Sequence, residues 1–149
     1  KKDRYACFVQ NNYLLKLNLL NISEPKWFGT RMCRKKDLKS PQWLREIKAK
    51  KIPFYKFYKP KFDRFIHEGG WHFSSVKNAQ GIYKKLNSYS EQQWNNDKFK
   101  NLELIKKKIE HKQDLFDRDH SFKVVKIDNN FPKYIYDNKE KFKEFIYNT

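Results

Sequence analysis

The chain has 149 residues, a length sufficient for one domain with a packed core. Of these residues 38% are hydrophobic and 17% aromatic, a composition that excludes a disordered protein. A formal net charge of +17 suits an anionic partner, but most of the excess is lysine. Arginine, whose planar fork recognises phosphate more specifically, occurs only at positions 4, 31, 34, 45, 64 and 118. We therefore do not expect nucleic acid to be the main partner.

Two further features limit the class of protein. No apolar run approaches the roughly 20 residues that a membrane-spanning helix needs, so we expect no transmembrane segment in this chain. Cys7 and Cys33 are the only cysteines, which is too few for a disulfide framework or a zinc site. We expect free thiols, with a single bridge between the two as the alternative.

The first half of the chain predicts short strands and one helix. Residues 13–20 alternate loosely between large apolar and polar groups and predict a strand, and residues 27–33 predict a second strand after the turn at Pro25. Ser40 and Pro41 are typical of a helix start, with a serine cap and a proline at the first helical position. The apolar face of that helix would be Trp43, Leu44 and Ile47. Residues 53–57 and 64–67 predict extended segments.

The second half predicts helices that pack on further strands. Residues 71–74 predict a strand, and Asn78 is expected to cap a helix through Leu86 with Ile82 and Leu86 on one face. Ser90 and Gln93 form a capping-box pattern before the next helical region. Its apolar stripe would be Phe99, Leu102, Ile105 and Ile109, with Lys106, Lys107, Lys108 and Lys112 outside.

Residues 122–127 predict a last strand, and Phe131-Pro132 predicts a turn. A final helix is expected to begin at Asn138, with Phe142, Phe145 and Ile146 facing inward. Together the predicted strands and helices indicate an α/β fold with a mixed sheet and packed helices, formed by a single domain over residues 1–149.

The most informative motif is Gly69-Gly70-Trp71-His72-Phe73-Ser74. The two glycines allow a tight turn and a close approach of other backbone. An aromatic face, an imidazole and a hydroxyl follow, which are groups that bind the C–H face and the hydroxyls of a sugar, and histidine adds a possible metal ligand or proton carrier. The alternative is a glycine turn that enters a buried strand, with His72 in a structural hydrogen bond.

From this motif onward the chain resembles glycosyltransferase family 17, which includes a β-1,4-mannosyl-glycoprotein N-acetylglucosaminyltransferase. The matching stretches are Gly69 to Ser74, Ile82 to Ser90, Asp114 to Arg118 and Phe131 to Ile135, preceded by Trp27 to Thr30 and the Leu44-Arg45 region. The family's D-x-D motif lies upstream of the matched region. The resemblance therefore implies the C-terminal, acceptor-side portion of a longer enzyme of GT-A type. The string Asp117-Arg118-Asp119 spells D-x-D in a different place and is not assigned a metal.

The resemblance implies inverting transfer of a sugar, such as N-acetylglucosamine, from a nucleotide sugar to a glycan acceptor. A carboxylate base would deprotonate the acceptor hydroxyl, and a divalent metal, Mn²⁺ or Mg²⁺, would stabilise the leaving diphosphate in the full enzyme. UDP-N-acetylglucosamine is the expected donor. A bacterial or viral member would be cytoplasmic, and a eukaryotic member would lie in the Golgi lumen.

Candidate roles follow from that chemistry. Glu68 and Asp114 are the candidate catalytic carboxylates, and His72 is the candidate metal or diphosphate contact. The candidate substrate-binding residues are Trp71, His72, Ser74, Lys84, Lys85 and Arg118. Each has a plainer alternative: Trp71 in the core, the lysines solvated, and Arg118 paired with Asp114.

Two other functions remain open. The first is a carbohydrate- or nucleotide-sugar-binding module without catalysis of its own, in place of the catalytic half of a glycosyltransferase. The missing D-x-D motif favours this binding module for the isolated chain. The second is a basic nucleic-acid-binding domain, and it predicts binding that weakens steeply with salt.

Overall fold

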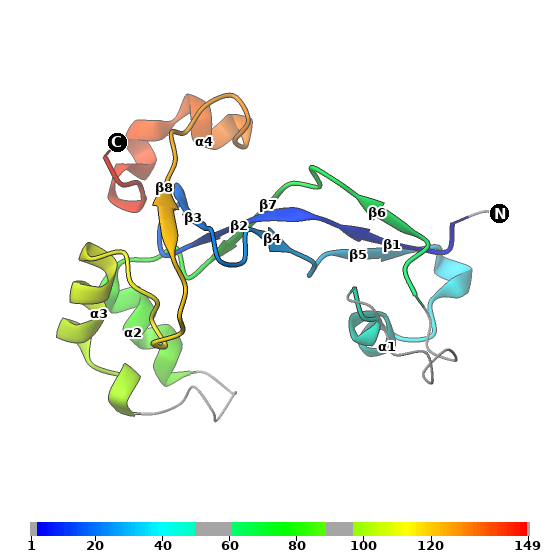
Figure 1. Cartoon of the computed structure of the whole chain (residues 1–149), viewed down its shortest axis with the longest axis horizontal. Helices are drawn as coiled ribbons and strands as arrows, with labels where there is room; N and C mark the ends of the chain where they lie inside the picture. Colours follow the sequence, from blue (N-terminus) through cyan, green and yellow to red (C-terminus); the bar gives the residue numbers. More distant parts are fainter. Residues whose placement is uncertain (1–2, 50–60, 89–96, 149) are drawn as a thin grey trace. The chain divides into compact units, whose positions relative to one another are not determined.

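The computed structural model describes residues 3–49, 61–88 and 97–148, which form a mixed α/β structure with a three-stranded sheet, a five-stranded sheet and short helices (Figure 1). The α/β class predicted from the sequence is confirmed. The chain divides into two compact units, which are described separately: unit 1 is Lys1–Asn11 with Lys26–Gly70, and unit 2 is Asn12–Pro25 with Trp71–Thr149. The extended segment expected over residues 53–57 and the capping box at Ser90 and Gln93 lie outside the described residues.

The three-stranded sheet belongs to unit 1. Its central strand β1 (Tyr5–Phe8) pairs antiparallel with β5 (Arg31–Cys33) and parallel with β6 (Arg64–Ile66). The strand predicted over residues 27–33 is wrong in its continuity, because β4 (Lys26–Trp27) ends before β5 begins. Gly29 separates them: a side chain there would collide with the Trp27 indole, whose Nε1 would lie 2.0 Å from an added Cβ.

The helix predicted at Ser40 is confirmed as α1 (Pro41–Glu46). The Ser40 hydroxyl accepts a hydrogen bond from the Trp43 amide at 3.1 Å, and proline occupies the first turn, where its missing N–H is harmless. Ile47 is buried, and the Trp43 ring meets the Tyr5 ring edge-on at 5.2 Å. A short 3-10 turn, η1 (Lys35–Asp37), precedes the helix.

The five-stranded sheet has the order β4–β2–β3–β8, with β7 (Trp71–Ser74) also paired to β2 (Gln10–Leu14). The single strand predicted over residues 13–20 is wrong: the chain reverses after β2 and returns as the antiparallel β3 (Leu19–Asn21). Leu15 enters this turn with a left-handed φ of 66° and yet is 1% exposed. Burial of its side chain offsets the conformational cost of about 1–2 kcal/mol. β8 (Phe122–Val124) is shorter than predicted and pairs antiparallel with β3.

Two helices lie on one side of β3 and β8 in unit 2, and the C-terminal helical segments lie on the other (Figure 1). The first pair is α2 (Ala79–Asn87) and α3 (Leu102–Glu110), preceded by η4 (Asp97–Phe99). As predicted, Asn78 caps α2, accepting from the Gly81 amide at 2.9 Å. Ile82, Leu86 and Ile105 are buried against Leu15 and Leu19.

The C-terminal segments are α4 (Lys133–Asp137) and the 3-10 helix η5 (Lys139–Phe145). They cover a second apolar cluster of buried residues: Tyr13, Leu17, Ile127 and Phe131. The predicted inward-facing residues Phe142, Phe145 and Ile146 pack against this cluster. The final helix therefore begins after Asn138 as predicted, but with the tighter 3-10 geometry.

The prediction that Lys108 lies on the outer face of α3 is wrong. Lys108 is buried in unit 2 and only 5% exposed. Its position three residues after Ile105 and one before Ile109 puts it inside the apolar stripe. Its ammonium donates to the Leu115 carbonyl at 2.9 Å and to the Asp117 carboxylate at 2.6 Å, which makes burial of the charge possible.

Candidate functional site

The glycine turn before β7 has the two properties that the sequence predicts. Gly70 has a φ of 107°, which side chains disfavour. Gly69 lies so close to its neighbours that an added Cβ would be 2.9 Å from the Ile66 carbonyl oxygen and 2.9 Å from the Cβ of the Phe8 side chain. Both glycines are therefore needed to bring the chain tightly into β7.

The two faces of β7 serve different purposes. Trp71 and Phe73 pack against the second apolar cluster, and the Trp71 indole N–H donates to the Asn130 carbonyl at 3.1 Å. Trp71 is partly buried against the core, as the plainer of its two alternatives predicts, and its role as a substrate contact stays a prediction. Because side chains alternate along a strand, His72 and Ser74 point to the opposite face. The motif thus presents its imidazole and hydroxyl together, away from its aromatic rings.

A cation from α2 lies at the end of this strand. The Lys85 ammonium donates to the Ser75 hydroxyl at 3.0 Å, and Ser75 follows β7 directly. Ser75 has a left-handed φ of 55°, an uncommon conformation for a residue other than glycine. We call His72, Ser75, Lys77 and Lys85 the β7–α2 cluster.

The electrostatics of the β7–α2 cluster favour an anion. Burial, and then the nearby charge of Lys85, lower the pKa of His72, so its imidazole is neutral at pH 7. Burial, and then the charge of Lys77, lower the pKa of Lys85. The protein therefore holds positive charges near one another in a half-buried place. A bound phosphate or carboxylate would relieve that repulsion and accept hydrogen bonds from both side chains.

Asp114 and Arg118, two other predicted site residues, bind each other. The Asp114 side chain is 2% exposed and accepts from Arg118 at 2.7 and 3.0 Å, from the Phe116 amide at 2.8 Å and from His120 at 3.2 Å. Burial raises the pKa of Asp114. The hydrogen bonds from Arg118 and the Phe116 amide lower it by more than burial raises it, so the pKa of Asp114 lies below its usual value. This carboxylate is a poor proton acceptor that fixes the loop after α3.

The remaining predicted residues are exposed. Glu68 belongs to unit 1, has a left-handed φ of 50° and an 81% exposed side chain, and lies 3.7 Å from the Lys26 ammonium. Lys84 is exposed on α2, one residue before Lys85. Their proposed roles, as base and as substrate contact, stay predictions.

Sequence reasoning missed the ion pairs around Asp117. Its carboxylate accepts from the buried Lys108 at 2.6 Å and from Lys98 at 2.8 Å, and these hydrogen bonds lower its pKa to about 2. A signal was present, since Lys108 falls within the apolar face of α3. Asp117, the first carboxylate of the D-x-D string, thus pairs with two lysines.

A metal ion does not fit the described residues. Nowhere in residues 3–49, 61–88 and 97–148 do three or more histidine, cysteine or carboxylate side chains converge in a way that would hold one. His72, the predicted ligand, has the Lys85 cation as its neighbour, which disfavours a second cation there.

Unit 1 has a pocket of about 200 Å³ bordered by Arg4, Arg34 and Arg64. Two of these arginines have acidic partners, since Asp37 pairs with Arg34 at 2.5 Å and Asp3 lies 3.8 Å from Arg64. A third carboxylate, Asp63, lies beside Arg4 and accepts a hydrogen bond from its backbone amide at 2.9 Å. The pocket therefore has little net attraction for an anion.

Comparison with known proteins adds no identification. The chain matches no protein-family model, no curated protein and no solved structure. Within the described residues, every helix is too short or too polar to cross a lipid bilayer.

Proposed function

We propose that the chain is the acceptor-side portion of a glycosyltransferase that uses a nucleotide sugar, and that the β7–α2 cluster contacts the donor's diphosphate. The observation that carries this proposal is the hydrogen bond between Lys85 and Ser75, which brings a cation from α2 to the end of the strand that bears His72. The order of motifs that resembles glycosyltransferase family 17 supports the same reading.

In this proposal the β7–α2 cluster stabilises the diphosphate leaving group. Breaking the bond between the sugar and the nucleotide leaves negative charge on the diphosphate, and fixed donors lower the cost of that charge. The Lys85 ammonium would supply a full positive charge, and the neutral His72 ring would supply one N–H. Ser74, on the same face of β7 as His72, would donate to a sugar hydroxyl.

A divalent metal stays an expectation for the complete enzyme only. The described residues do not form a site for it, so no step is assigned to a metal in this chain. Mn²⁺ or Mg²⁺ would be held by the upstream D-x-D half that the resemblance implies.

A second candidate function is nucleotide-sugar binding without catalysis. It is favoured by Asp114, because a carboxylate engaged by Arg118, His120 and backbone amides is unsuited to deprotonate an acceptor hydroxyl. Under this reading the β7–α2 cluster still binds the diphosphate, but no transfer follows.

The test is a titration of UDP-N-acetylglucosamine, with and without Mn²⁺, followed by NMR. We expect weak binding that perturbs the signals of His72 and Lys85, and we expect Lys85→Gln to remove it while Lys107→Gln, an exposed lysine on α3, does not. Micromolar, metal-dependent affinity would show that the site is complete in this chain. Perturbations that avoid β7 and α2 would contradict the proposal.

Transfer separates the two candidate functions. The same donor, Mn²⁺ and a glycan acceptor are incubated with this chain and with a longer chain that includes upstream sequence. Product formed by the longer chain, and reduced by His72→Ala, supports the transferase. Binding without product in either chain supports the binding module.

A further inference from the structure

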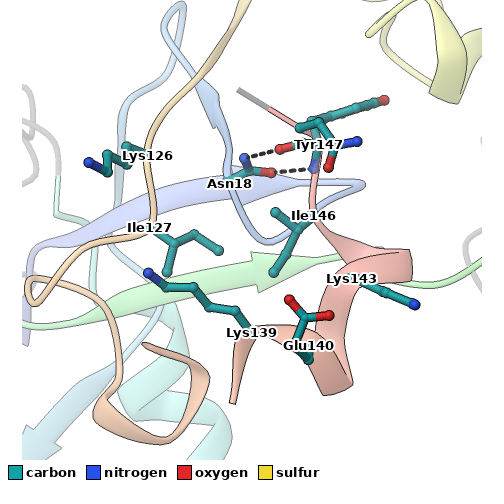
Figure 2. A pocket seen from close by; sticks show the side chains of 9 residues that line it. Asn18, Lys126, Ile127, Lys139, Glu140, Lys143, Ile146 and Tyr147 are labelled. Atoms are coloured by element: carbon teal, nitrogen blue, oxygen red, sulfur yellow. Dashed lines mark hydrogen bonds between the residues drawn. The ribbon is translucent and has the colours of Figure 1, made fainter. Parts of the chain in front are cut away.

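A second pocket, which belongs to unit 2, lies beside the C-terminal helical segment, and none of its lining residues belongs to the β7–α2 cluster. It has a volume of about 240 Å³ and is bordered by the turn between β2 and β3, the segment that follows β8, η5 and the residues after η5. Figure 2 shows Lys139 extending past Ile127, with Lys126 and Lys143 at opposite edges.

The walls of this pocket are fixed by a buried asparagine. Asn18 is 1% exposed, donates to the Tyr147 carbonyl at 2.9 Å and accepts from the Tyr147 amide at 2.8 Å (Figure 2). The Leu17 amide donates to the Phe145 carbonyl at 2.8 Å, one step along the same turn. These bonds hold the end of η5 against the β2–β3 turn, so the pocket exists before any ligand binds.

The charges around the pocket are unbalanced. Lys126, Lys139 and Lys143 border it, and Glu140 is the acidic residue among its lining side chains. In the described part of the chain, no carboxylate lies within ion-pair distance of any of these lysines. Elsewhere in unit 2, Lys108, Lys98 and Lys133 do have such partners. A bound anion would therefore neutralise the positive charge of Lys126, Lys139 and Lys143.

The rest of the lining suits a small ring. Ile127 and Ile146 give the pocket an apolar wall. Lys139, which lines the pocket, also contacts the Tyr136 ring outside the lining: this ring is 40% exposed, and the Lys139 ammonium lies 4.3 Å from its centre. An exposed aromatic face beside a cation fits the C–H face of a sugar next to its phosphate. The volume is below the roughly 300–1,000 Å³ of pockets for larger ligands, which indicates a ligand of monosaccharide size.

We propose that this pocket binds a phosphorylated monosaccharide, with the phosphate among Lys126, Lys139 and Lys143. The sugar ring would lie against Ile127 and Ile146 and extend toward the Tyr136 ring that Lys139 contacts. Lysine ammonium groups on flexible stems can turn inward from the rim to the phosphate. The site is independent of the proposed function, because it uses none of the residues of the β7–α2 cluster.

The experiment is a calorimetric titration with glucose 6-phosphate, inorganic phosphate and glucose, at low and moderate salt. We expect glucose 6-phosphate to bind best, inorganic phosphate more weakly and glucose weakest, with affinity that falls as salt rises. The double variant Lys126→Gln/Lys143→Gln should weaken binding of glucose 6-phosphate by about tenfold or more. The matched control is Lys107→Gln/Lys123→Gln, which removes the same charge from exposed positions outside the pocket.

NMR locates the bound ligand. Glucose 6-phosphate should shift the side-chain amide of Asn18 and the backbone amide of Tyr147, and Tyr136→Ala should weaken the sugar phosphate while sparing inorganic phosphate. Three results would overturn the site: no measurable binding to the unmodified chain, an equal loss in the control variant, or loss on Lys85→Gln with the pocket lysines intact. The last would assign the phosphate to the β7–α2 cluster, whereas failure of that cluster to bind UDP-N-acetylglucosamine leaves this result unaffected.

Discussion

Replacing Lys108 by methionine tests the most unexpected interaction in unit 2. The variant keeps the apolar stem but removes an ammonium that donates to the Leu115 carbonyl at 2.9 Å and to Asp117 at 2.6 Å. Breaking a fully buried ion pair costs about 3–5 kcal/mol, but the Asp117 side chain is 46% exposed and keeps Lys98 as a partner. The dominant cost is the unsatisfied Leu115 carbonyl, which gives a loss of about 2 kcal/mol.

Urea denaturation at pH 7 measures this loss as a change in the free energy of unfolding. A loss of that size lowers the melting temperature by about 4–8 °C in a protein of this length. The control is Lys107→Met, the exposed neighbour on α3, which should change stability by less than about 0.5 kcal/mol. If Lys108→Met is as stable as the control, the result would contradict the buried position and the ion pair described for Lys108.

The same variant has a defined pH dependence. The pKa of Asp117 is lowered from 3.8 to about 2 in the folded chain, by hydrogen bonds from Lys108 and then Lys98. Its stabilisation is therefore complete above the unfolded pKa and is lost as the pH falls through the folded pKa. We expect the stability difference between Lys108→Met and the unmodified chain to shrink between about pH 5 and pH 2, with only the Leu115 contribution left.

The remaining predictions concern the Asp114 loop and the first helix. Asp114→Asn should destabilise the chain by about 2–3 kcal/mol in urea, because a buried carboxylate bound to Arg118 is lost, while UDP binding by the folded chain stays the same. Unchanged stability together with lost transfer activity would instead make Asp114 catalytic. Ser40→Ala should cost about 1 kcal/mol of stability by removing the hydrogen bond to the Trp43 amide, and Ser40→Asp should retain most of it. Equal stability of the two Ser40 variants would show that the cap contributes little.

Local signals in the sequence predicted the elements of unit 2 that depend on them. Asn78 and the pair Ile82 and Leu86 specify the start and the buried face of α2, and both are as expected. Residues 71–74 form the predicted strand, and Trp71 and Phe73, two residues apart, pack against the same apolar cluster, as alternation predicts. In each case the structural rule acts within a few residues of sequence.

Tertiary effects account for what the sequence did not predict. The turn after β2 contains neither glycine nor proline, and Leu15 adopts its left-handed conformation because the core buries its side chain. Lys108 is buried because Asp117, beyond the end of α3, supplies its counter-charge. The proximity of Lys85 to Ser75 depends on how α2 packs beside β7, which no local pattern encodes.

The central claim is that the β7–α2 cluster receives a diphosphate, and the pKa of His72 tests it directly. The pKa is followed by NMR of the His72 ring protons, assigned with His72→Gln, in the free chain and at saturating UDP. In the free chain it should lie below 6.5, and Lys85→Gln should raise it because a repelling charge is removed. A diphosphate beside the ring favours the imidazolium, so UDP should raise the pKa of His72, and UDP should bind more tightly as the pH falls. A His72 pKa that is the same with and without bound UDP would contradict the account.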